Sequence, residues 1–251
     1  MVKEANVRGL DAGVFIFHSY LAATIVLLPF SLGDGVSLYD VVVGVAAGLL
    51  VSFASVSAYR AVGLLGGITV FPLVNLSYLL SLLYGVLLLG ENVKPVNIVG
   101  LPFAAVSLLL LAERPSRITG RGLLYLGTAF LGYGFTDIVL KTYYRMAGEP
   151  HSMTLSLVID LTVTLHLALS SPGRGLGRVS WLALLNGLLL AVSTISLVKA
   201  LSSGPVSLVS PIAKLNTVIP VVYSMARGET YDSETVLSAL LAVTAVLLLS
   251  I

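Results

Sequence analysis

The sequence predicts an all-α integral membrane protein, a polytopic bundle of about nine transmembrane helices. Three observations lead to this fold class: the composition, the length of the apolar runs and an internal repeat. Of the 251 residues, 57% are apolar and only 10% are charged, and the mean hydropathy is +1.01, whereas a soluble domain is about one quarter charged. These charged residues are too few to cover a surface that faces water, so the lipid bilayer must be the solvent.

The apolar residues fall into nine runs, each long enough to cross roughly 30 Å of hydrocarbon as a helix of about 17 to 25 residues. Short connections such as "ENVKP" and "SPGRGLGR" separate the runs, and glycine, proline and charged residues cluster in them as they do in turns. The predicted spans, in chain order, are 12–31, 39–60, 66–89, 95–112, 121–144, 152–170, 179–200, 205–226 and 233–251.

Several functional classes are excluded by what the sequence lacks. It has no cysteine, which excludes thiolate metal sites and cysteine nucleophiles. It has no HExxH zinc motif, no GxSxG nucleophile elbow and no GxxxxGK[ST] phosphate loop. We therefore expect neither an enzyme nor an ATP-driven pump, and no cofactor or metal. The net charge of +2 is too small to suggest a nucleic-acid partner.

Two stretches align without a gap at a shift of 139 residues: "GLLVSFASVSAYRAVGLLGGITVFP" (48–72) and "GLLLAVSTISLVKALSSGPVSLVSP" (187–211). Further along the chain, "LGEN" (89–92) lies over "RGET" (227–230) after a slip of one residue. A repeat unit with an odd number of spans reverses its direction in the membrane, which is the plan of many secondary transporters. The informative matches are a proline, a basic residue followed by alanine, and a Gly-Glu pair at a helix end: Pro72/Pro211, Arg60-Ala61/Lys199-Ala200 and Gly90-Glu91/Gly228-Glu229.

The order of these elements resembles the drug/metabolite transporter superfamily, specifically its EamA-type members. In each half a span ends in a basic-alanine step, a proline-containing span ends in Gly-Glu, and a closing apolar span follows. Here these elements are "AYRAVG … FP … LLGEN" and "LVKALS … SP … ARGET", and the resemblance covers nearly the whole chain. It implies two inverted sets of five helices that carry small molecules across the cell membrane by alternating access.

Members of that superfamily typically have ten spans, and the first span has no counterpart in this sequence. We expect either a truncated or misassigned start or a true nine-span variant. The repeat divides the chain into an N-terminal half of four helices (1–115) and a C-terminal half of five (116–251). The distribution of lysine and arginine predicts a cytoplasmic N-terminus and an external C-terminus, whereas the resemblance implies that both termini are cytoplasmic.

Lys214 is the most informative polar residue. It lies roughly 15 Å from either interface, because about ten residues of helix separate it from Gly204 and about twelve from Ala226. Its side chain is too short to reach the interface, and an unpaired charge at that depth costs several kcal/mol. Lys214 could form a structural ion pair with Asp160 or Asp137, line the translocation path and attract a carboxylate or phosphate group, or be neutral. The first two readings are compatible, since a substrate can release a paired lysine.

The repeat aligns Asn75 with Lys214, and each follows a proline by three residues on one helix face. Pro72 and Pro211 remove a backbone hydrogen bond, so they could act as hinges where the freed carbonyls face protein or water; a packing kink is the alternative. We expect a central substrate cavity lined by polar and aromatic side chains, namely Lys214, Asn75, Asn216, Asp160, Tyr78 and Tyr133.

Two acidic residues inside the spans have competing interpretations. Asp137 and Lys141 are four residues apart on one helix face, which favours a local ion pair near the membrane edge. Asp160 lies nearer the centre of its span. Its carboxylate could carry a coupled proton, or it could be a structural partner of Lys214.

The remaining polar or small residues favour structural roles. We interpret His18 and His166 as histidines whose hydrogen bonds are satisfied within the bundle. Glu91 and Glu229 end their spans beside glycines, so we expect them to cap or contact neighbouring loops. The stretch "GVAAG" (44–48) has the small-xxx-small spacing that allows two helices to approach closely.

The sequence therefore predicts a secondary active transporter, multi-pass in the cell membrane, that moves a small polar metabolite. If Lys214 contacts the cargo, the cargo is expected to bear a carboxylate or phosphate. Because no nucleotide-binding loop is present, the energy must come from a solute or ion gradient, with proton coupling as one option. The alternatives are a non-transporting membrane scaffold or subunit, a channel and, less favoured, an intramembrane enzyme.

Overall fold

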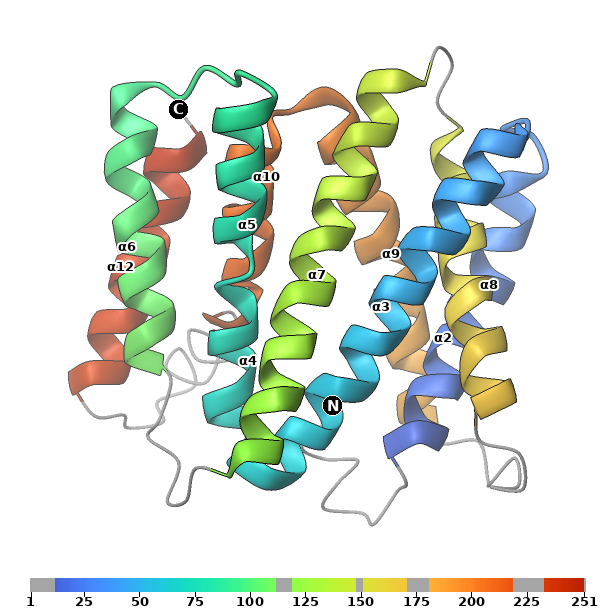
Figure 1. The fold of residues 1–251 in the computed structure, drawn as a ribbon, viewed down its shortest axis with the longest axis horizontal. Helices are drawn as coiled ribbons and strands as arrows, with labels where there is room; N and C mark the ends of the chain where they lie inside the picture. Colours follow the sequence, from blue (N-terminus) through green and yellow to red (C-terminus); the bar gives the residue numbers. More distant parts are fainter. Residues whose placement is uncertain (1–11, 112–118, 148–150, 171–180, 219–232, 251) are drawn as a thin grey trace. The chain divides into compact units, whose positions relative to one another are not determined.

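The structure is a computed structural model that describes residues 12–111, 119–147, 151–170, 181–218 and 233–250, and its regular structure in these ranges is entirely helical (Figure 1). The predicted all-α class is confirmed. Backbone groups in lipid have no water to bond to, so long apolar segments satisfy them internally as helices. The helices are α2 (Ala12–Ser31), α3 (Leu38–Leu65), α4 (Gly67–Asn75), α5 (Tyr78–Leu83), α6 (Pro95–Leu111), α7 (Gly120–Met146), α8 (Ser152–Ser170), α9 (Trp181–Ser203), α10 (Val206–Lys214) and α12 (Ser233–Ser250), with a π-helical turn η1 (Tyr84–Leu88) after α5 and a 3-10 turn η2 (Leu215–Val218) after α10.

In the described part of the chain, 6 helical segments are long and apolar enough to cross a membrane, so the chain is a multi-pass membrane protein. Two further apolar helices, Pro95–Leu110 and Ser233–Leu249, are shorter and coincide with the fourth and ninth predicted spans. The eighth predicted span, 205–226, is described only as far as Val218, and its remainder lies outside the described residues.

The third predicted span, 66–89, is divided into α4, α5 and η1. Gly66 separates α3 from α4 with a φ of 85°, a backbone conformation that glycine adopts without a steric penalty. Pro72 has no N–H to donate, and α4 ends three residues later, at Asn75, before α5 begins at Tyr78. The proline that the sequence identified therefore lies just before a helix break.

The same helix and proline register occurs a second time in the chain. Helices α4 and α10 each contain 9 residues, with Pro72 and Pro211 at the sixth position of "GITVFPLVN" and "VSLVSPIAK". Residues 67–75 and 206–214 are also the residues that the sequence repeat aligns. The local structure thus repeats at the spacing at which the sequence repeats.

Two compact units divide the chain: unit 1 comprises residues 1–56 and 139–203, and unit 2 comprises residues 57–138 and 204–251. Each unit contains segments from both predicted halves, 1–115 and 116–251. The boundaries fall inside α3 and α7, which contribute residues to both units.

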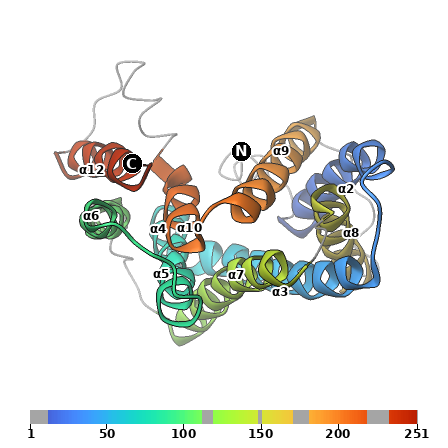
Figure 2. The ribbon, with the colours of Figure 1, turned by 90° about the horizontal axis from the view of Figure 1, so that it is seen from above.

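Within unit 1, α2 packs against α8 and α9 (Figure 2). Glycines permit the closest approaches. A Cβ on Gly187 of α9 would lie 2.5 Å from the carbonyl oxygen of Ser19 on α2, and one on Gly48 of α3 would lie 2.6 Å from Thr162 Cβ on α8. A Cβ on Gly44 would lie 2.7 Å from a side chain of α8. The close helix approach predicted from "GVAAG" is confirmed.

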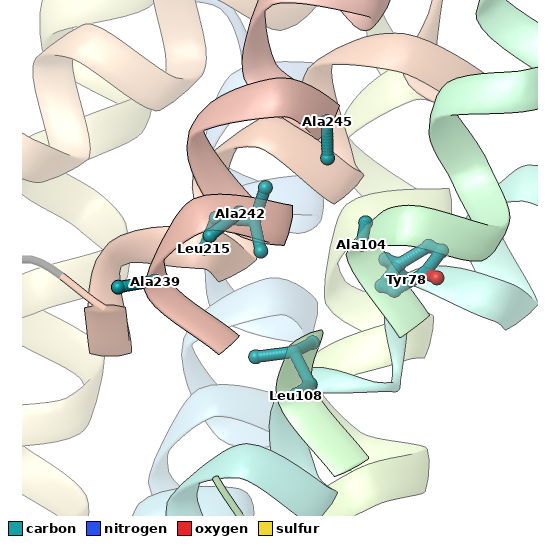
Figure 3. Packing of buried hydrophobic residues seen from close by; sticks show 7 residues of the cluster. All are labelled: Tyr78, Ala104, Leu108, Leu215, Ala239, Ala242 and Ala245. Atoms are coloured by element: carbon teal, nitrogen blue, oxygen red, sulfur yellow. The ribbon is translucent and has the colours of Figure 1, made fainter. Parts of the chain in front are cut away.

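Within unit 2, α6 and α12 run antiparallel side by side (Figures 1 and 2). Asn97 near the start of α6 donates a 2.8 Å hydrogen bond to the Leu248 carbonyl near the end of α12. Near the other ends of the two helices, the hydroxyls of Ser107 and Ser238 lie 3.2 Å apart. Figure 3 shows a hydrophobic cluster that includes residues of both helices, formed by Tyr78, Ala104, Leu108, Leu215, Ala239, Ala242 and Ala245.

Candidate functional site around Lys214

Lys214 is the last residue of α10, and its ammonium group meets a carboxylate inside unit 2. Lys214 Nζ lies 3.4 Å from Oδ2 of Asp137 on α7, and the two side chains are 14% and 2% exposed. The sequence left Asp160 and Asp137 open as partners. The ion-pair interpretation of Lys214 is confirmed, with Asp137 as the partner.

Two serine hydroxyls complete the environment of the Asp137 carboxylate. Ser81 on α5 donates a 3.3 Å hydrogen bond to Asp137 Oδ2, and Ser210 on α10 donates a short one to the same oxygen. Helix α7 can come this close to α5 because Gly134 has no side chain; a Cβ there would lie 2.6 Å from Leu80 Cδ1. The carboxylate therefore accepts a hydrogen bond from α5, and it accepts a hydrogen bond from α10 and forms an ion pair with it.

Tyr133 provides an aromatic neighbour for the ammonium group. It precedes Asp137 by one helical turn on α7, and Lys214 Nζ lies 5.5 Å from the centroid of its ring. At this distance the negative face of the ring attracts a cation. The structure thus brings Tyr133 beside Lys214.

The two asparagines lie at the backbone end of Lys214. Asn75 Nδ2 donates a 2.8 Å hydrogen bond to the Lys214 carbonyl and a 3.3 Å bond to Asn216 Oδ1. This carbonyl lies at the end of α10, where the α-helix passes into the 3-10 turn η2. Asn75 therefore binds the backbone at the helix end that follows Pro211. We call the seven residues Lys214, Asp137, Ser81, Ser210, Tyr133, Asn75 and Asn216 the Lys214 centre.

Sequence reasoning missed two members of this centre, Ser210 and Ser81. Ser210 precedes Lys214 by four residues on the same helix, so their shared face was readable from the sequence. Ser81 carried no such signal, because only the packing of α5 against α7 brings it to Asp137. The prediction paired Asp137 with Lys141; in the structure Asp137 pairs with Lys214, and Lys141 Nζ donates a 3.3 Å hydrogen bond to the carbonyl of Leu201.

The sequence also predicts Tyr78 and Asp160 as cavity residues. Tyr78 is fully buried in the hydrophobic cluster of unit 2, and its hydroxyl donates a 3.1 Å hydrogen bond to the Leu101 carbonyl. Asp160 lies on α8 in unit 1, is 1% exposed, and neither carboxyl oxygen has a hydrogen-bond partner among the described residues.

The structural roles predicted for two histidines are confirmed. His18 Nδ1 lies 2.8 Å from the carbonyl of Val14, one turn earlier on α2. His166 Nδ1 lies 2.6 Å from the hydroxyl of Ser52, and its ring lies 4.8 Å from the ring of Phe53. Both side chains are satisfied within unit 1.

Glu91 holds the start of α10. Its carboxylate accepts hydrogen bonds from the backbone N–H groups of Val206 and Ser207, each at 2.9 Å, and from the Ser207 hydroxyl at 2.7 Å. These N–H groups have no partner inside the helix, and a negative charge is favourable at this end. The capping role predicted for Glu91 is confirmed, whereas Glu229 lies outside the described residues.

A second polar cluster, which the sequence analysis did not identify, joins two connections within unit 1. Asp40 at the start of α3 accepts a 2.5 Å hydrogen bond from the Tyr143 hydroxyl and lies 2.8 Å from His151 Nδ1. Asp34 accepts hydrogen bonds from the N–H groups of Met153 and Thr154 in the first turn of α8, at 2.7 Å and 3.2 Å. The cluster fastens the α2–α3 connection to the start of α8.

No protein-family model and no curated protein matches this sequence. Among solved structures, 29 chains match the fold. One of them, described as "Crystal structure of protein", has a TM-score of 0.75 and 17% sequence identity, and the match covers 95% of this chain and 87% of that chain. At this identity the similarity shows that the two chains share a fold.

Proposed function

We propose that this protein is a secondary active transporter of the cell membrane, EamA-like in plan, that moves a small polar metabolite by alternating access between two inverted repeats. The observation that carries the proposal is the Lys214 centre, an ion pair with hydroxyl and aromatic neighbours in otherwise apolar helices. Such a pair adds little stability, because removing two charges from water costs about as much as their attraction returns. Binding a polar solute accounts for its presence.

The chemistry of the centre suits a solute with a carboxylate or phosphate group. Lys214 supplies three N–H donors and a positive charge, and a solute anion could take the place of Asp137 beside it. The hydroxyls of Ser81 and Ser210 can both donate and accept hydrogen bonds. The ring of Tyr133, which already faces the ammonium, would contact the apolar part of the solute.

Two features support the inverted repeat. A two-fold axis in the membrane plane brings equivalent residues together where they meet the axis, and it makes equivalent helices antiparallel. Asn75 and Lys214, which the sequence repeat aligns, are joined by a hydrogen bond across 139 residues. Helices α6 and α12, the closing spans of the two halves, run antiparallel. Both relations are expected of an inverted repeat and not of a direct one.

Pro72 and Pro211 would act as the hinges of this transporter. In both nine-residue helices the regular α-helical structure ends three residues after the proline, at Asn75 and Lys214, so a change of backbone angle there would cost few helical hydrogen bonds. The residues that follow the two prolines, Asn75 and Lys214, belong to the Lys214 centre. Bending at the prolines would therefore move the residues that hold the solute.

Uptake into proteoliposomes tests the proposal. The wild type, Lys214→Ala and Lys199→Ala are compared with radiolabelled monocarboxylates, dicarboxylates and sugar phosphates; Lys199 is an exposed lysine on α9 and serves as the matched control. We expect saturable uptake by the wild type and by Lys199→Ala, with loss in Lys214→Ala. The absence of saturable flux for every solute in a folded wild type would favour the scaffold alternative. Chemical turnover without movement across the bilayer would favour the enzyme.

A further inference from the structure

We propose that Asp137 is the proton-coupling group of this transporter: it takes up a proton when a solute anion displaces it from Lys214, so that anion and proton cross together. This inference rests on the proposed function. It adds a co-substrate, a stoichiometry of about one proton per solute molecule, because one carboxylate holds one proton, and the residue that binds the proton.

The first step concerns charge balance in the Lys214 centre. In the structure the positive charge of Lys214 and the negative charge of Asp137 compensate each other at 3.4 Å, with Asp137 only 2% exposed. An anion that binds the ammonium leaves two negative charges beside one positive charge. An uncompensated charge is costly in such a buried place. One proton on Asp137 restores the balance that existed before the anion arrived.

The second step concerns the groups that face Asp137. Lys214 on α10 contacts Asp137 directly, and Tyr133 on α7 contacts the Lys214 ammonium. Lys141 follows Asp137 by one turn on α7, and Tyr59 on α3 neighbours Tyr133. A phenol does not supply positive charge, and the ammonium of Lys141 bonds to the carbonyl of Leu201. Lys214 is therefore the cation that compensates the charge of Asp137. When a solute anion binds Lys214, Asp137 loses that compensation.

The third step concerns the hydroxyls of Ser81 and Ser210. Both donate to Asp137 Oδ2 in the structure, where the carboxylate is paired with Lys214. A hydroxyl can also accept a hydrogen bond, and rotation about the C–O bond is enough to change its role. Either serine could therefore accept the O–H of a protonated Asp137. The centre offers hydrogen bonds to both protonation states without a rearrangement of helices.

Asp160 is the other buried acid to which a coupled proton could be assigned. Its carboxyl oxygens have no hydrogen-bond partner among the described residues. Binding at Lys214 changes the charge next to Asp137 by direct contact, and a coupling group must respond to occupancy. The contact therefore assigns the proton to Asp137.

The test uses the full chain in proteoliposomes that contain a pH-sensitive dye. The probes are pyruvate, succinate, inorganic phosphate and glycerol phosphate. We expect the wild type to take up at least one probe faster when the outside is acidic, with acidification inside that matches the uptake. Asp137→Asn, which mimics the protonated acid, should exchange labelled for unlabelled probe across equal pH but lose the acceleration by a pH gradient. Glu234→Gln, which removes an exposed carboxylate on α12, should keep both.

Each outcome decides a separate point. If the wild type moves no probe, the proposed function and this inference both fail. If the wild type moves a probe without protons, or Asp137→Asn keeps its response to the pH gradient, only the coupling role of Asp137 fails. If Asp137→Asn does not fold, infrared spectra of the wild type take its place. Adding the transported probe at neutral pH should produce the carbonyl stretch of a protonated carboxylic acid, also in Asp160→Asn, and its absence would overturn the inference.

Discussion

Replacement of Gly48 by alanine should open the contact between α3 and α8. The new Cβ would lie 2.6 Å from Thr162 Cβ and 2.8 Å from the carbonyl oxygen of Ile159, about 1 Å closer than an ordinary van der Waals contact. A change of rotamer could move the methyl group of Thr162, but Thr162 Cβ and the carbonyl oxygen of Ile159 are fixed to the backbone of α8, so the helices must separate. Overpacking of this kind costs about 1–3 kcal/mol, and we expect the upper end of that range.

Reversible unfolding in mixed micelles, with denaturing detergent as the variable, measures this loss. Gly63→Ala is the matched control, because Gly63 lies on the same helix and a Cβ there has nothing within 4 Å. It should leave the unfolding free energy unchanged or raise it by up to about 1 kcal/mol through helix propensity. Gly187→Ala should resemble Gly48→Ala. Equal unfolding free energies for Gly48→Ala and Gly63→Ala would refute the packing described for unit 1.

Two further substitutions test the polar contacts that hold connections in place. Glu91→Gln should lower the unfolding free energy by about 1–2 kcal/mol, because α10 loses charge-assisted hydrogen bonds at its N-terminus, and hydrogen exchange at Val206 should accelerate; unchanged exchange would contradict the capping role. Asp40→Asn should cost about 1–3 kcal/mol, because it weakens the hydrogen bonds to Tyr143 and His151. Proteolysis of the α2–α3 connection should become faster in that variant, and an unchanged cleavage rate would count against the cluster.

The apolar spans were predictable because the bilayer imposes length and composition on each segment independently of the others. The predicted span 152–170 coincides with α8 (Ser152–Ser170), and 12–31 coincides with α2 (Ala12–Ser31). The break inside 66–89 was only partly predictable. Pro72 indicated a weakened helix, but whether a proline kinks a helix or ends it depends on what satisfies the freed carbonyls, and that information lies in the neighbouring helices.

The Lys214 centre shows where sequence reasoning ends. Because Lys214 was predicted to lie deep in the membrane, we expected its charge to need a partner, and the sequence offered Asp160 and Asp137. Only the packing of the helices shows that the partner is Asp137. Ser210 and Asp137 are 73 residues apart, and their contact depends on which helices are neighbours. The same holds for Asp40 and His151, which are 111 residues apart and carry no periodic signal. Residues at the ends of spans have the composition of ordinary turns, so the sequence does not indicate which connections contact each other.

The most direct test of the account compares the half-saturation concentration of a transported anion in wild-type protein and in Asp137→Asn, measured by exchange at equal pH on both sides of the proteoliposome membrane. If a solute anion displaces Asp137 from Lys214, removing the competing carboxylate should lower the half-saturation concentration. An increase, or loss of saturation while the variant remains folded, would mean that Asp137 does not compete with the solute for Lys214, and would contradict the account.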